Sequence, residues 1–185
     1  MALTSDTIPG YTTGTWVSDP THSEITFSVR HLAISKVKGN FGKFTITAVT
    51  SDDPHATAIT ASIDVTSINT GNEQRDGHLR TNDFFAPEEF PTIEFVSTAI
   101  RHDGDDVFID GDLTVRGVTK PTTFTGEFGG VAENGYGMTM AGGSFTTKIN
   151  RHDFGVSWNA VLEAGGITLG DDVTITIDAQ LALQA

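Results

Sequence analysis

The chain has 185 residues, 37% of them hydrophobic and 19% charged, a composition that indicates one globular domain and excludes a disordered chain. Its 24 acidic and 11 basic residues give a formal net charge of −13, which argues against a nucleic-acid partner and against permanent docking on anionic lipid head groups. Cysteine is absent from the sequence, which excludes disulfides, thiolate nucleophiles and cysteine-ligated metals.

The N-terminal residues 1–14 are predicted to be an extension that precedes a single domain over residues 15–185. The start of the chain, MALTSDTIPGYTTGT, has neither a basic beginning nor an apolar run of signal-peptide length, so we expect a cytoplasmic protein. No later segment reaches the ~20 apolar residues of a membrane span. We therefore expect no permanent insertion into a membrane.

The first half of the chain contains three predicted strand regions. Residues 25–31 alternate apolar and polar side chains, the pattern of a half-buried strand, and His31 ends the inward-facing row. Residues 41–48 change phase across Gly42, which indicates a bulge or a bend. Residues 59–65 alternate again. Each region therefore directs one face into a common interior.

The segment 71–90, GNEQRDGHLRTNDFFAPEEF, interrupts the strand pattern. Its polar residues Arg75, His78 and Asn82 are spaced three and four positions apart, which predicts a short helix or helical turns. Gly77 lowers the helix propensity of the segment. We expect a short helical insertion between strands.

The second half of the chain returns to strand patterns. The run from Met138 to Ile149 changes phase across the Gly142-Gly143 pair, which again indicates a bulge. Together with the first half, this makes about eight to ten strands, a number that suits a barrel or a sandwich. The other expected strands are the strictly alternating 107–115 and 173–183 and the weaker 93–100, 122–128 and 154–158.

Three stretches of the sequence together resemble the YceI-like family: SINTGNEQRDGHLRTNDFF at 67–85, GDLTVRGVTKPTTF at 111–124 and INRHDFG at 149–155. The resemblance implies an all-β fold, an antiparallel lipocalin-like β-barrel of about eight strands with a short helical insertion, around a long apolar tunnel. The ligands implied by this family are polyisoprenoids, isoprenoid quinones and other long-chain lipids. Many of its members are exported, and His152 stands where the motif often has another polar residue.

The inward-facing apolar positions provide the candidate tunnel lining. The small residues Ala61, Gly111, Gly142 and Ala179 favour a cavity, although glycines that relieve strain in a bent sheet would give the same pattern. Apolar burial contributes about 0.8 kcal/mol per methylene, so a linear hydrocarbon needs no charged or catalytic residue in order to bind. The candidate lining residues are Phe27, Val29, His31, Phe41, Ile63, Val65, Leu113, Ile175 and Ile177.

Polar residues in two of the family motifs provide candidate head-group contacts, namely Arg75, His78 and Arg151. Either arginine could bind a diphosphate in a forked geometry. In the structural alternative, the charged residues of the insertion form an ion-pair network, and Arg151 pairs with Asp153 or with a carboxylate of the insertion. His31 likewise either contacts a head group or is hydrogen-bonded at the barrel rim.

These observations predict a binding protein that carries or stores a long apolar ligand and has no catalytic residue, cofactor or metal. No HExxH, EF-hand, GxSxG or P-loop pattern occurs, and GYGMTMAG lacks the spacing of a dinucleotide site. One alternative is an enzyme that acts on a bound isoprenoid through the insertion and the His152 turn. Another is a stress-related structural protein without a dedicated ligand. Exposed strand edges would also allow a homodimer, although no residue pattern demonstrates one.

Overall fold

The computed structural model describes residues 4, 7–161 and 168–185, and within them it confirms an antiparallel β-barrel with one short α-helix. The strands are β1 Gly14–Ser18, β2 Glu24–His31, β3 Ser35–Phe41, β4 Phe44–Thr50, β5 Ala58–Asp64, β6 Ile68–Asn69, β7 Thr92–Asp103, β8 Asp106–Val115, β9 Val118–Glu133, β10 Thr139–Asn150 and β11 Leu169–Leu183. The helices are α1 Glu73–Leu79 and the 3-10 turns η2 Pro54–Ala56, η3 Val65–Ser67 and η4 Arg151–Phe154.

Eight of these strands close the barrel, in the order β1, β4, β5, β7, β8, β9, β10 and β11. Closure depends on β11, which changes partner along its length. Residues Leu181–Leu183 pair with β1, whereas residues 169–178 pair with β2. Strand β2 in turn carries β3 and the short β6. The barrel is therefore extended at one end by a second set of strands.

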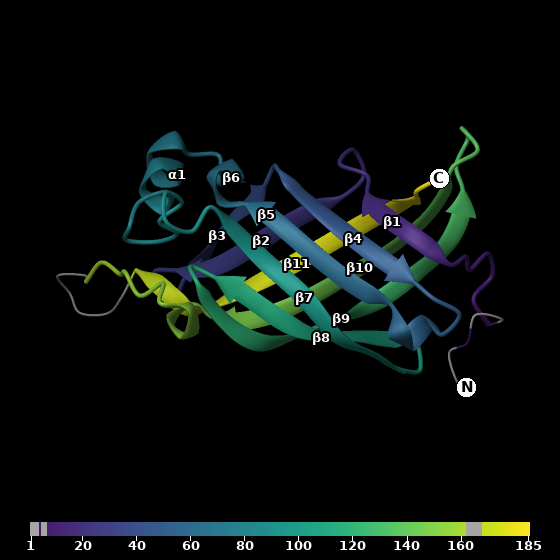
Figure 1. Ribbon diagram of the computed structural model, residues 1–185. Helices are drawn as coiled ribbons and strands as arrows, with labels where there is room; N and C mark the ends of the chain where they lie inside the picture. The colour runs from purple at the N-terminus through teal and green to yellow at the C-terminus, as the bar shows by residue number, and fades with distance from the viewer. Residues whose placement is uncertain (1–3, 5–6, 162–167) are drawn as a thin grey trace.

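The two ends of the barrel differ in what lies over them (Figure 1). Helix α1 and residues 155–161, which follow η4, lie at one end, while the β9–β10 turn and the C-terminus lie at the other. Asn72 caps α1, because its side chain accepts a hydrogen bond from the Arg75 backbone N–H. The predicted helical insertion thus forms, although its α-helical part is only seven residues long.

The structure corrects two of the expected strands. Residues 154–158 form no strand, because Gly155 adopts a left-handed conformation (φ 73°) and the carbonyls of Val156 and Trp158 accept hydrogen bonds from Arg151 instead of from a neighbouring strand. The phase change at Gly42 is a bend, one of the two predicted alternatives, but it separates two strands, β3 and β4, which pair with different neighbours. By contrast, the shift at Gly142 and Gly143 is a register irregularity within β10, as predicted.

An ion pair on the outer wall links β7 and β8. Arg101 donates to both carboxylate oxygens of Asp110, at 2.5 and 2.8 Å, and the Thr123 hydroxyl donates to the same carboxylate. The hydrogen bond from Arg101 is the main cause that lowers the pKa of Asp110 to about 2. Since the folded-state pKa lies below the unfolded value, the stabilisation is present above about pH 4 and is lost as the pH falls toward 2.

We expect Asp110→Asn to lower the free energy of unfolding by less than about 1 kcal/mol at neutral pH, because the pair is exposed to solvent. The variant should also lose part of the pH dependence of stability below about pH 4. Urea unfolding at neutral pH and near pH 3 measures both effects. An unchanged acid dependence in Asp110→Asn would show that this carboxylate does not contribute to it.

Candidate functional site

A cavity of about 620 Å³ lies inside the barrel. This volume is within the ~300–1,000 Å³ range of small-molecule sites in proteins. Most of its wall is apolar, built by side chains on the inward faces of the strands. Seven of the described lining residues are polar, and they are His31, Asn72, Gln74, Arg75, His78, Arg151 and Thr168.

The elements that carry or adjoin these polar residues, namely the end of β2, α1 with its cap, η4 and the start of β11, lie at one end of the barrel (Figure 1). Arg75 is exposed and also lines the cavity, so the cavity reaches solvent at this end, which we call the mouth. No aspartate or glutamate is among the described lining residues, although acidic residues outnumber basic residues in the chain by 24 to 11. The cavity therefore combines a hydrocarbon-like interior with a cationic mouth.

The alternation in the sequence places most of the predicted tunnel residues on this wall. Phe27, Val29, His31, Phe41, Ile63, Leu113, Ile175 and Ile177 line the cavity. Val65 does not, because Asp64 caps the η3 turn and turns the chain out of β5, which leaves Val65 buried in the packed core. The prediction of Val65 as a tunnel residue was therefore wrong.

Several lining residues were not singled out from the sequence. Phe95, Phe124 and Phe145 continue the inward rows of β7, β9 and β10, and the alternation of those strands would have been sufficient to find them. The mouth residues Phe84 and Trp158 follow no period, because they belong to irregular segments. Only their tertiary position identifies them.

The small residues divide into two kinds. Ala61 and Ala179 line the cavity, as a cavity interpretation requires, whereas Gly111 and Gly142 do not. A side chain at Gly111 would collide with the Phe95 ring, so this glycine allows the ring to lie over the strand. Its absent side chain is thus replaced by an aromatic ring and leaves no empty space.

Arg75 is held at the mouth by the loop that precedes α1. Its Nε and Nη2 donate to the hydroxyl and the carbonyl of Thr70, at 2.7 and 2.9 Å. Thr70 is itself fixed by the buried carboxylate of Asp76, which accepts hydrogen bonds from the Thr70 backbone N–H and hydroxyl. The guanidinium therefore has a defined position, and its Nη1 makes no hydrogen bond to any other described residue.

His78 belongs to an aromatic cluster beside Arg75. Its ring packs edge-on against Trp158 and Phe84, with centroids 4.6 and 5.1 Å away, and its Nε2 lies 2.8 Å from Asp83. Within the described part of the insertion, this contact joins two of the residues for which the sequence suggested an ion-pair network. The neighbouring arginines are bonded to backbone or hydroxyl oxygens instead, since Arg80 donates to the carbonyls of Thr66 and Ile68.

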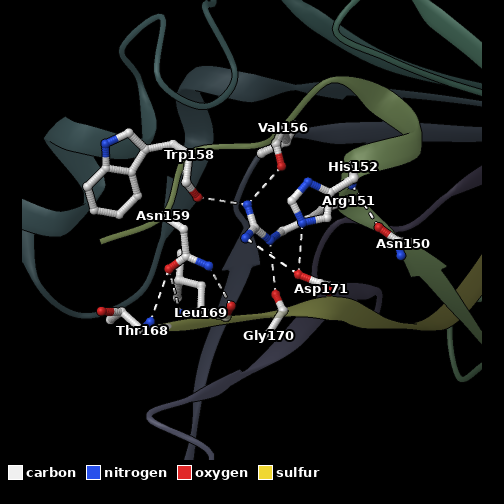
Figure 2. Close-up of polar contacts among 10 residues, drawn as sticks. All are labelled: Asn150, Arg151, His152, Val156, Trp158, Asn159, Thr168, Leu169, Gly170 and Asp171. Atoms are coloured by element: carbon white, nitrogen blue, oxygen red, sulfur yellow. Dashed lines mark hydrogen bonds and ion pairs between the residues drawn. The ribbon is translucent and has the colours of Figure 1, made fainter. Parts of the chain in front are cut away.

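Arg151 is 5% exposed and organises the backbone at the mouth (Figure 2). Its Nη1 donates to the carbonyls of Val156 and Trp158, each at 2.8 Å, and its Nε donates to the carbonyl of Gly170 at 2.9 Å. Among the described carboxylates, Asp171 is the one within ion-pair distance, 3.9 Å from Nη2. The predicted pairing with Asp153 or with the insertion is therefore wrong. Burial lowers the pKa of Arg151, and the charge of Asp171 opposes this effect.

In the part of the chain that the structure describes, no three His, Asp or Glu side chains come together in a way that could hold a metal ion. None of the helices within the described ranges is long and apolar enough to span a bilayer. The arrangement is best suited to holding an apolar molecule that has one polar end.

Comparison with known proteins agrees with this geometry. Residues 16–181 match the YceI-like domain. The chain belongs to the YceI-like family. This YceI-like chain is 40% identical over 168 residues to a UPF0312 protein of Staphylococcus aureus strain MSSA476, which covers 89% of the chain and 95% of the relative.

Solved structures show the same fold. BcnA of Burkholderia cenocepacia has a TM-score of 0.74 at 22% identity, over 88% of the YceI-like chain and 98% of BcnA. The YCEI protein of Campylobacter jejuni has a TM-score of 0.68 at 32% identity, with 84% and 90% coverage. A polyisoprenoid binding domain from Saccharophagus degradans has a TM-score of 0.66 at 14% identity, with 94% and 100% coverage. The family and the barrel predicted from the sequence are confirmed.

Proposed function

We propose that the chain binds, carries or stores a long apolar ligand, an isoprenoid or another lipid, in the barrel cavity. The observation that carries this proposal is the division of the cavity wall, which is apolar throughout the barrel and polar only at the mouth. A ligand with a hydrocarbon tail and a single polar end matches this division. The polyisoprenoid-binding description of the Saccharophagus degradans neighbour supports the same ligand class.

The energetics favour a tail-dominated site. Ten buried methylenes would contribute about 8 kcal/mol before ordering costs are subtracted, so the tail alone can produce useful affinity. Apolar burial is not directional, and a methylene more or less changes the affinity only modestly. We therefore propose binding rather than catalysis, with loose selectivity for tail length.

A direct experiment is to purify the chain without detergent, record its mass under native conditions and extract the bound material. The proposal expects a lipid in stoichiometric amount, released intact on denaturation. A chain without bound lipid that also fails to bind added geranylgeraniol would contradict the proposal. Conversion of the bound lipid into a product during incubation would favour the enzyme alternative.

Arg75 is the residue best placed to contact the polar end of the ligand, because its Nη1 makes no hydrogen bond to another described residue. If that end is a diphosphate, Arg75→Gln should weaken binding of geranylgeranyl diphosphate by about 1.5–3 kcal/mol, or roughly 10- to 100-fold. Binding of the neutral alcohol geranylgeraniol should change little. Titrations with both ligands, followed by the emission of Trp158, measure the difference.

Arg80→Gln is the matched control. Arg80 is also an exposed arginine of the insertion that donates to carbonyls, but it does not line the cavity. Arg80→Gln should leave the affinities for the diphosphate and for the alcohol unchanged. If Arg75→Gln weakens binding of the diphosphate and of the alcohol equally, Arg75 has a structural role. The proposal that the cavity binds the apolar tail would be unaffected by that result.

A further inference from the structure

The β2–β3 hairpin lies at the mouth and differs in character from the rest of the chain. Its first strand ends at His31, which lines the cavity, and the backbone N–H of Leu32 donates to the carbonyl of Thr168, another lining residue. The residues between the strands, Leu32, Ala33 and Ile34, form what we call the apolar tip. The tip is thus continuous with the cavity entrance.

The apolar tip exposes hydrophobic side chains in a strained turn. Leu32 and Ala33 have positive φ angles of 52° and 59°, a conformation in which glycine or asparagine is usual. Ile34 is 83% exposed. Val161, also 83% exposed, lies nearby, because its neighbour Ala160 accepts a hydrogen bond from the Thr168 N–H. Exposed apolar side chains therefore gather at the mouth of an apolar cavity.

The outward face of the same hairpin is cationic. From Glu24 to Phe41 the hairpin has three basic residues, Arg30, Lys36 and Lys38, and one acidic residue, Glu24, at the first position of β2. Arg30 lies directly opposite Lys36 in the strand register, and Lys38 follows on the same face. Like charges directly opposite one another destabilise a strand pair. Among the described residues, none of these three cations has an ion pair, so the fold leaves them available to an anionic partner.

Within the described ranges, no carboxylate lies within ion-pair distance of Arg30, Lys36 or Lys38. Asp172 is paired with Lys148 at 2.6 Å, and Asp171 is hydrogen-bonded to the His152 ring at 2.8 Å. Asp83, at the same end of the barrel, is occupied by His78. Repulsion from the more distant charges of the chain is screened beyond about 8 Å at physiological ionic strength. When the hairpin touches a charged surface, the electrostatic interaction is therefore determined mainly by the charges of the hairpin itself.

We propose that the β2–β3 hairpin docks the mouth of the barrel transiently onto the surface of an anionic lipid bilayer. The apolar tip enters the head-group region, while Arg30, Lys36 and Lys38 contact anionic lipids. This places the cavity entrance against the phase in which a long-chain lipid is dissolved. The inference rests on the proposed function and adds to it the partner from which the ligand is loaded or to which it is delivered.

Co-sedimentation with phosphatidylcholine vesicles, with and without phosphatidylglycerol, tests the proposal. The chain should bind only the anionic vesicles, and added salt should weaken binding. Lys38→Glu should lower the affinity at least about fivefold, since one lysine near an anionic surface contributes about that factor. Ile34→Ser should lower it by on the order of tenfold, because an isoleucine side chain loses its apolar burial.

Two control variants match these changes in kind. Lys120→Glu makes the same change in net charge on an exposed strand residue of β9, outside the hairpin. Tyr136→Ser removes a side chain that is 90% exposed from the β9–β10 turn at the opposite end of the barrel. Both controls should bind anionic vesicles as the unmodified chain does. Equal losses in the hairpin and control variants would overturn the assignment to the hairpin.

Native mass measurement of the same proteins separates this inference from the proposed function. A chain that carries lipid but does not bind anionic vesicles refutes the docking proposal alone. A chain that binds the vesicles through the hairpin but never holds a lipid refutes the proposed function alone. If Ile34→Ser and Lys38→Glu instead convert a dimer into a monomer and leave vesicle binding unchanged, the hairpin is a contact between copies of the chain, and docking is refuted.

Discussion

Ala61→Phe should greatly weaken ligand binding while leaving the barrel folded. Ala61 lies on β5 opposite Ile46 and Phe95, and its side chain faces the cavity. The additional ring carbons would occupy the space of about three methylenes or more, which corresponds to about 2.4 kcal/mol, or roughly fiftyfold in affinity. Because the ring enters existing space, the free energy of unfolding should change by less than about 1 kcal/mol. Titration with geranylgeraniol and urea unfolding measure the two quantities.

Ala48→Phe is a matched control at an equally buried alanine. The exposed fractions of Ala61 and Ala48 are 7% and 6%, but Ala48 does not line the cavity and lies opposite the buried Trp16. Insertion of a ring at this position should overpack the wall and cost about 1–3 kcal/mol of stability. If both variants lose the same stability, and Ala61→Phe keeps its affinity for geranylgeraniol, the interior is a packed core.

Arg151→Gln should destabilise the protein by about 3 kcal/mol or more. The substitution removes the donors to the carbonyls of Val156, Trp158 and Gly170, and a buried acceptor without a partner costs about 1–3 kcal/mol. Arg151→Lys should recover only part of the loss, because an ammonium group lacks the planar fork that reaches several carbonyls. Urea unfolding followed by circular dichroism gives the free energies.

This experiment also decides between the two roles considered for Arg151. If Arg151 is a scaffold residue, Arg151→Gln should lower the affinity for geranylgeraniol and for geranylgeranyl diphosphate to a similar extent, because the substitution loosens the mouth itself. A variant of normal stability that selectively loses diphosphate binding would instead make Arg151 a head-group residue. Its Nη2, which is buried and has no hydrogen bond to any described residue, is the atom that such a contact would use.

Local pattern in the sequence was sufficient for the strands and for the wall of the cavity. Residues 25–31, 107–115 and 173–183 alternate strictly and form β2, β8 and the later part of β11. Successive side chains of a strand point to opposite faces, so the same alternation predicts which side chains point inward. For this reason residues such as Phe27, Leu113 and Ile175 could be placed on the wall without knowledge of the fold.

The mouth and the closure of the barrel were decided only by the tertiary structure. Closure joins Trp16 to Leu183, and such a pairing has no local signature because it links residues at opposite ends of the chain. The expected strand at 154–158 failed for a different reason, since the buried Arg151 donates to the carbonyls of Val156 and Trp158, which a strand would have needed. Alternation along a strand shows which face of the sheet each residue lies on. It does not show the hydrogen-bond partners of a buried polar side chain, because these depend on which segments of the chain meet around that side chain.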